Sequence, residues 1–260
     1  MSITLSTQDF ILLLSAAKLT AYSKPDEDGI LSGVYLSTTE GEDGDSVGVG
    51  TLLVAVGFDG ATVGQFAVPA TGTLAAPILL PFHDTGWLAA MCGKAQKIAG
   101  KTDKEAEHTV ELTVSGSSLL VKTLTDGFPA EYDVDGRSPL LDTTQYPARE
   151  ANNRLKTPSI GESVPTDADS LVRVFGVQSL NVMLKAAKTL KSPIRVFPSP
   201  VNGGPAILTD GMRWRAVTSV EPYEGATAGN PDIEPLEIPE PKATVLDTAP
   251  TEALPTEDAE

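Results

Sequence analysis

The chain has 260 residues and one cysteine; 41% of its residues are hydrophobic, and 35 acidic against 19 basic residues give a formal net charge of -16. This length suffices for one large or two small domains. The lone cysteine excludes an internal disulfide and fits the cytoplasm, while the absence of a long apolar run argues against a membrane span. Evenly spread, this acidity would also exclude nucleic acid, because phosphate binding needs a basic surface.

The acidity is concentrated at the C-terminal end. From residue 226 onward the chain contains one lysine and nine acids, a net charge of -8, together with six prolines and no aromatic residue. Such a segment cannot bury enough apolar surface to offset the entropy of ordering it. We therefore expect a folded body over 1–225 and a disordered, acidic, proline-rich tail over 226–260.

Three segments of the body repeat one order of elements: strand, helix, strand, strand, strand. The first is expected to have a strand at 3–6, a helix over 7–21 and strands at 29–38, 51–60 and 61–70. The second has a strand at 76–81, a helix over 84–100 and strands at 108–116, 118–124 and 128–134. The third has a strand at 171–176, a helix over 177–190 and strands at 193–199, 205–211 and 213–220. The repeat predicts an α+β fold with helices packed on antiparallel sheets.

Hydrophobic periodicity supports these elements. In residues 108–116 the apolar Val110, Leu112 and Val114 alternate with polar residues, which is the period of two of a half-buried strand. Each helix carries an apolar stripe. The stripes are Phe10, Leu13, Leu14, Ala17 and Ala21; Met91, Ala95, Ile98 and Ala99; and Leu180, Met183, Leu184, Ala187 and Leu190. Thr7 and Asp84 suit helix starts.

A stretch of about 35 residues between the second and third segments breaks the repeat. It shows little strand pattern and predicts only a short helix from about Pro147 to Leu155. We therefore expect a full domain of two units over 1–136 and a shortened domain over 137–225, with one clear unit after an irregular segment at 137–170.

The repeated unit and several local sequences resemble the DNA sliding clamps, in particular the bacterial polymerase III beta clamp. ILLPFHDTGWLAAMCGKA, HTVELTVSGSSLLVKT and FPAEYDVDG are similar to the second half of a clamp domain, and GVQSLNVMLKAAKTLKSPIRVFPSPVNGGPAILTDGMRWRAVTSVEPY is similar to the end of the last domain. The resemblance, which includes shortened clamps of the phage type, implies a processivity factor that encircles duplex DNA and binds a replicative polymerase and a clamp loader without a cofactor.

The resemblance also bears on assembly. Clamps of the family close as dimers of three-domain chains or trimers of two-domain chains, with twelve units in each ring. Three units in this chain would need four copies, and a fourth unit hidden in 137–170 would need three. The sequence leaves a trimer, a tetramer and a monomer that does not close as alternatives.

The basic residues concentrate in the predicted helices. Seven of the twelve lysines lie there with only two acids, Asp9 and Asp84. The lysines are Lys18, Lys94, Lys97, Lys101, Lys185, Lys188 and Lys191. At about 100° per residue, Lys94, Lys97 and Lys101 share an arc of about 60° away from the apolar stripe. The resemblance implies that these helices face the DNA backbone; the alternative is that lysine simply favours helices and their last turns.

The remaining residues offer little chemistry. His83 and His108 are isolated, Cys92 lies within an amphipathic helix, and no cluster has the spacing of a zinc site, so we predict no enzyme, metal or catalytic residue. The resemblance implies that partner peptides dock near Val217, Val220 and Pro222, although the terminal methionine-proline pattern of the family is absent. Two other functions stay open: a clamp-fold interaction module that does not encircle DNA, and a viral structural or assembly protein.

Overall fold

The computed structural model describes residues 2–22, 32–41, 49–102, 108–125, 134–156, 175–197 and 204–220. The first unit contains β1 (Ser2–Ser6), α1 (Thr7–Ala17), β2 (Gly33–Gly41), β3 (Gly50–Phe58) and β4 (Thr62–Pro69). The second contains β5 (Ile78–Pro81), α2 (Phe82–Thr102), β6 (His108–Ser115), β7 (Ser118–Thr125) and β8 (Asp135–Pro139). A short 3-10 helix, η2 (Thr143–Gln145), and α3 (Ala148–Leu155) follow. The third unit contains α4 (Val177–Leu190), β9 (Arg195–Phe197), β10 (Ala206–Thr209) and β11 (Trp214–Thr218).

The predicted α+β fold is confirmed. Residues 128–133 of the strand predicted at 128–134 lie outside the described residues, and the strand that pairs with β7 is β8, which the sequence did not predict. Its sequence, DGRSP, alternates no large apolar residues, so only the pairing with β7 reveals it. Of the strand predicted at 171–176, residues 171–174 lie outside the described residues, as does the predicted tail at 226–260.

The first two units exchange strands. One sheet has the order β1-β6-β7-β8, so the first strand of unit one completes the sheet of unit two. In return, β5 of unit two pairs with β2 of unit one. All of these pairings are antiparallel. The two units are therefore interlocked by reciprocal strand pairing.

The third unit joins the first by a continuous sheet. The larger sheet has the order β5-β2-β3-β4-β11-β10-β9, in which β4 and β11 pair antiparallel from Phe66 with Trp214 to Thr62 with Thr218. At the end of this pairing the Thr62 and Thr218 hydroxyls lie 2.9 Å apart. The sheet thus runs across the boundary expected at residue 136, and the division into domains stays a prediction.

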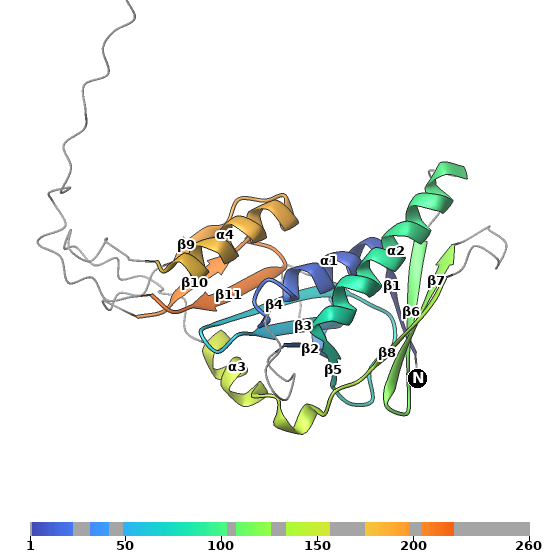
Figure 1. Ribbon diagram of the computed structural model, residues 1–260, viewed down its shortest axis with the longest axis horizontal. Helices are drawn as coiled ribbons and strands as arrows, with labels where there is room; N and C mark the ends of the chain where they lie inside the picture. Colours follow the sequence, from blue (N-terminus) through green and yellow to red (C-terminus); the bar gives the residue numbers. More distant parts are fainter. Residues whose placement is uncertain are drawn as a thin grey trace, which may run out of the picture.

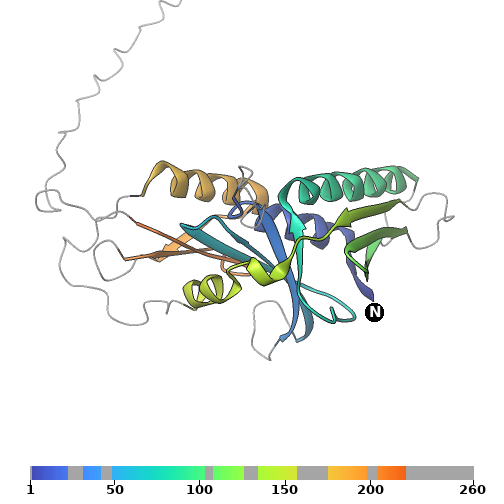
Figure 2. The same cartoon turned by 60° about the horizontal axis from the view of Figure 1, so that its bottom comes forward.

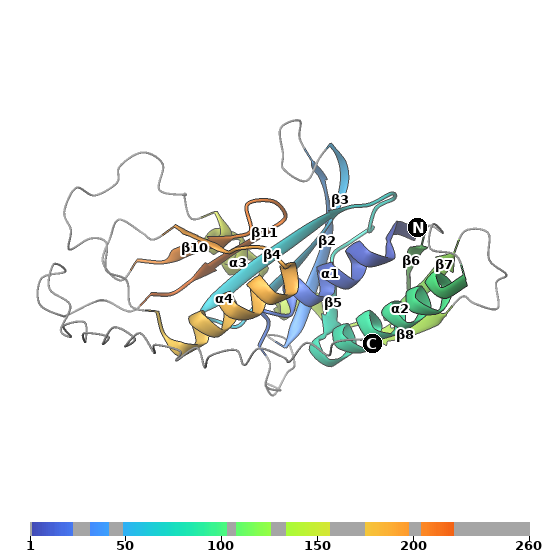
Figure 3. The same ribbon diagram turned by 90° about the horizontal axis from the view of Figure 1, so that it is seen from above.

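The helices divide between the two faces of the sheets. Helices α1, α2 and α4 lie on one face, with α1 between the other two (Figures 1 and 3). Helix α3 lies on the opposite face of the larger sheet (Figure 2). The main core fills the space under α1, α2 and α4, and a second cluster around Val56, Ile207 and Val217 lies beneath Ala151 and Leu155 of α3.

The three helices bury side chains with one spacing. The buried sets are Thr7, Phe10 and Leu14 in α1; Thr85, Leu88 and Cys92 in α2; and Ser179, Val182 and Ala186 in α4. Each set places a hydroxyl three residues before an apolar side chain, with a second apolar side chain four residues later, which keeps all three on one helical face. This pattern aligns the units position by position.

The predicted apolar stripes agree with burial only in part. The whole stripe of the first helix is buried. In α4, however, Leu180 and Leu184 are exposed, and the sheet is contacted by Ser179, Val182 and Ala186 instead. Ile98 of α2 is also exposed, whereas Met91 and Ala95 are buried as predicted. Met183 and Leu190 of the predicted α4 stripe do pack against the main core, so the stripe is confirmed in part and wrong at Leu180 and Leu184.

Candidate nucleic-acid interface

Five of the seven predicted lysines project from the helix layer with exposed side chains. Two are on α2 and three are on or just after α4: Lys94, Lys97, Lys185, Lys188 and Lys191. Lys191 caps α4 in a left-handed backbone conformation, with φ 51°. Lys101 belongs to α2, but its side chain lies outside the described residues. Helices α2 and α4, which carry these lysines of two different units, lie in one layer of the protein (Figure 3).

Lys18 has a different environment. It follows the end of α1 and is partly buried against α2, with Nζ 4.3 Å from the ring centroid of Phe82. Burial lowers the pKa of Lys18. A β-carbon at Gly86 would lie 2.7 Å from this Nζ, so the glycine leaves room for the ammonium group. Lys18 therefore helps to pack α1 on α2 by a cation-π contact.

Both acids of the layer are engaged by other residues. Asp9 forms a salt bridge with Arg213 from the β10–β11 turn. The Asp84 carboxylate accepts a hydrogen bond of 2.6 Å from Ser138 and lies 2.7 Å from His83 Nε2. Among the described residues, no salt bridge joins Lys94, Lys97, Lys185 or Lys188 to an acid. Their charges consequently add to a positive local field, whatever the net charge of the chain.

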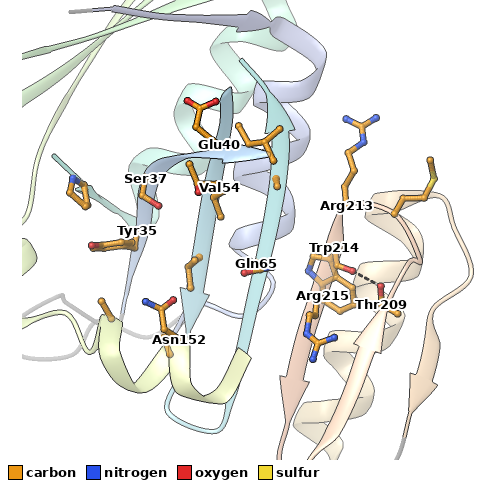
Figure 4. Close-up of a pocket in the computed structure, with 18 of the residues that line it drawn as sticks. Tyr35, Ser37, Glu40, Val54, Gln65, Asn152, Thr209, Arg213, Trp214 and Arg215 are labelled. Atoms are coloured by element: carbon orange, nitrogen blue, oxygen red, sulfur yellow. Dashed lines mark hydrogen bonds between the residues drawn. The ribbon is translucent and has the colours of Figure 1, made fainter. Parts of the chain in front are cut away.

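The opposite face of the larger sheet has a hollow of about 800 Å³ (Figure 4). It lies between β2, β3, β4, α3 and the β10–β11 turn. On its wall the rings of Tyr35 and Tyr146 stack with centroids 5.0 Å apart. Burial, together with Tyr35, raises the pKa of Tyr146 above its ordinary range. Sequence reasoning missed this hollow, because its walls come from segments far apart in the chain and carry no shared motif.

The residues predicted to bind a partner peptide are mostly covered. Val217 is packed in the cluster beneath α3, and Val220 is buried. Pro222 lies outside the described residues. Val217 also borders a smaller hollow of about 230 Å³, which Ala61, Arg154 and Ser219 line as well. The peptide site stays a prediction.

The described residues supply little for catalysis. They contain no group of three or more histidine, cysteine or acidic residues that could bind a metal ion. Burial raises the pKa of the Cys92 thiol to about 11, so its thiolate form is suppressed. His108 Nδ1 lies 3.2 Å from the Thr125 hydroxyl within the sheet. Of the helices in these ranges, none has the length and apolar character needed to cross a membrane.

Solved structures share this architecture, although the sequence itself matches no protein-family model and no curated protein. Solved structures do match: a beta sliding clamp from Caulobacter crescentus (16% identity, TM-score 0.51), the DNA polymerase III beta subunit from Thermotoga maritima (11%, 0.53) and a DnaN sliding clamp from Pseudomonas aeruginosa bound to griselimycin (11%, 0.54). The chain has the sliding-clamp fold.

The match covers most of this chain but only part of each clamp. The aligned region covers 84%, 89% and 86% of this chain but only 65%, 66% and 66% of those three clamps. The clamp fold is therefore present in a chain that spans about two thirds of their length. At identities this low, the likeness establishes the fold and leaves the function to be argued from the residues.

Proposed function

We propose that the chain is a DNA sliding clamp, a processivity factor that assembles into a ring around duplex DNA and tethers a replicative polymerase. The observation that carries the proposal is the helix layer, on which exposed lysines of α2 and α4 stand while Asp9 and Asp84 are paired elsewhere. Lysines that contact phosphates supply attraction without reading sequence. A ring that must move along DNA needs this kind of attraction.

The lysines divide into two roles in this proposal. Lys94, Lys97, Lys185, Lys188 and Lys191, with Lys101 at the end of α2, are the DNA-facing set. Lys18 belongs to the same layer, but its contact with Phe82 makes it chiefly a packing residue. The partners proposed are duplex DNA, the polymerase, a clamp loader and further copies of the chain in a trimer or tetramer. The chain acts without catalysis or a cofactor, in the cytoplasm.

Charge reversal on α4 tests the DNA-facing surface. The double variant Lys185→Glu/Lys188→Glu changes the charge by -4 per chain, and so does Arg149→Glu/Lys156→Glu on α3, where both side chains are exposed on the opposite face. We expect the first pair to abolish DNA binding and the second to leave it nearly unchanged. Each single lysine substitution that removes one phosphate contact should also reduce the slope of the salt dependence by about 0.9. This slope relates the logarithm of the DNA-binding constant to the logarithm of the salt concentration.

The measurement is fluorescence anisotropy with a labelled duplex across a salt series, and circular dichroism checks that both variants are folded. Equal losses of affinity in the two variants would show that DNA responds only to the overall charge, and the proposed surface would be wrong. Wild-type binding that depends on the DNA sequence would also contradict a sliding contact.

One observation favours a second function. The chain spans only about two thirds of the length of the clamps it matches, so a clamp-fold interaction module that binds proteins without encircling DNA is the alternative. Light scattering separates the two proposals, because a chain that stays monomeric at micromolar concentration forms no ring.

A further inference from the structure

Helix α4 carries an exposed apolar surface. On the side turned away from the sheet, the exposed fractions of Val177, Leu180 and Leu184 are 76%, 46% and 71%. These residues recur at intervals of three and four, so they form one stripe along the helix. Val196 and Phe197 of the neighbouring strand β9 are exposed as well. Exposed apolar side chains that gather on one side of a surface helix mark a contact surface.

The chain itself shows what covers this position in a complete pair of units. Helix α2 packs on α1: Gly86 lies beside Lys18, and Gly93 lies 3.8 Å from Ile11 Cδ1, measured from the position of an added β-carbon. The contact moves backward along α1 as it moves forward along α2, so the two helices are antiparallel. Gly86 and Gly93 each follow a residue of the repeated buried pattern, Thr85 and Cys92. Their equivalents on α4 are Leu180 and Ala187.

The face of α4 equivalent to the α1-contacting face of α2 therefore includes exposed Leu180, with Leu184 beside it. The sheet shows the same gap. Strand β6 follows α2 and pairs with β1 of the other unit, whereas β9 follows α4 and pairs only with β10 among the described residues. Among the described residues, no strand pairs with the outer edge of β9, and Leu180 and Leu184 on this helix face are exposed.

We propose that a second copy of this chain covers this surface, with the two α4 helices packed antiparallel across a two-fold axis and the two β9 edges turned toward each other. A two-fold axis requires a surface complementary to itself. Here α4 has the burial pattern of both α1 and α2, so two α4 helices can reproduce the α1–α2 pairing.

The pairing of α1 with α2 sets the register. Met183 of α4 is equivalent to Ile11 of α1, because each follows the second residue of the buried pattern. Ala187 of α4 is equivalent to Gly93 of α2, because each follows the third residue. In the proposed dimer, Met183 of each copy therefore contacts Ala187 of the other copy, as Ile11 contacts Gly93. The midpoint of this pair is residue 185. Leu184 therefore lies next to the axis, close to its own counterpart.

The contact selects one assembly for the proposed ring. Strands β4, β8 and β11 are each the last strand of a unit, and β4 already pairs with β11. The outer edge of β8 pairs with no other described strand. If β8 meets β8 of another copy as β4 meets β11, then two kinds of two-fold contact close four chains of three units into a ring of twelve. The inference rests on the proposed clamp, which it deepens, and it favours the tetramer over the trimer.

Sedimentation velocity on the full chain, without DNA, tests the contact. Leu184→Glu should weaken self-association at least tenfold, because it places a charge in the apolar contact. Val49→Glu is the control, since Val49 is 72% exposed but lies at the start of β3. Both variants should keep the wild-type circular dichroism spectrum. A monomeric wild-type chain, or equal effects of the two variants, would overturn the proposal.

A cross-link tests the register independently. Leu184→Cys should form a covalent dimer on oxidation, because the axis brings position 184 close to its copy, and Val49→Cys should not. The native Cys92 is buried and does not compete. A chain that binds DNA but fails both tests would refute this pairing of α4 helices and leave the lysine surface standing.

Discussion

Gly57→Ala should lower the stability of the fold, because α1 packs closely on the sheet at Gly57. Gly57 of β3 is paired with Gly64 of β4, and the end of α1 crosses both. A β-carbon at Gly57 would lie 2.1 Å from the Ala17 carbonyl oxygen and 2.8 Å from the Ala21 nitrogen. The buried Thr20 hydroxyl also donates to the Gly57 carbonyl at 3.1 Å. Because the obstructing atoms belong to the backbone, no change of side-chain rotamer relieves the overlap.

The sign of the effect separates packing from chain entropy. Replacing glycine by alanine at an unstrained position stabilises a protein by about 0.4–1 kcal/mol. Overpacking a core costs about 1–3 kcal/mol, and here the end of α1 must move away from the sheet that covers Phe10 and Leu14. We expect Gly57→Ala to lower the free energy of unfolding by about 3 kcal/mol, at the upper end of that range.

Urea denaturation measures this difference. With a slope of about 2 kcal/mol per molar urea, a decrease of about 3 kcal/mol moves the midpoint down by about 1.5 M. Gly93→Ala is the matched control, because its β-carbon would meet only Ile11 Cδ1 at 3.8 Å, and it should raise stability by up to about 1 kcal/mol. A Gly57→Ala chain as stable as the wild type would refute the close packing of α1 on β3.

Two further predictions concern buried titratable groups. Cys92, with its pKa raised to about 11 by burial, should react with thiol reagents at pH 8 only as the chain unfolds, so rapid labelling without denaturant would contradict its burial. The raised pKa of Tyr146 means that the unfolded chain loses this proton first, so stability is intact below pH 10 and falls as the pH rises further. Tyr146→Phe should flatten the fall, as measured by urea midpoints from pH 9 upward; an unchanged profile would assign the fall to other groups.

Sequence reasoning succeeded where one helix or strand carries its own signal. The stripe of α1 runs along the single face that contacts the sheet, so periodicity finds it. The short helix α3 was also predicted nearly to its bounds. The same rule was only partly right for α4. Met183 and Leu190 pack against the core as predicted, but small residues, Ser179 and Ala186, are the ones buried toward the sheet, and the leucines at 180 and 184 lie toward solvent. If a second copy covers those leucines, both faces of α4 are buried in the assembly. Hydrophobic periodicity then cannot identify a single core face.

The remainder depends on contacts between distant segments. Nothing local to β4 or β11 shows that the two strands pair, although this pairing attaches the third unit to the first. The partners of Asp9 and Asp84, Arg213 and Ser138, are likewise distant in the chain. The lysines of the helix layer could be located from sequence because they lie on regular helices, whereas the burial of Lys18 against Phe82 depends on how α1 meets α2.

Topological retention on DNA tests the central proposal most directly. The chain is assembled on a closed circular plasmid, half of the sample is cut once with a restriction enzyme, and both halves are passed through a gel-filtration column in moderate salt. A sliding clamp stays with the circular DNA and dissociates from the cut DNA, because a ring can leave only over a free end. Equal retention on circular and cut DNA would contradict the proposal.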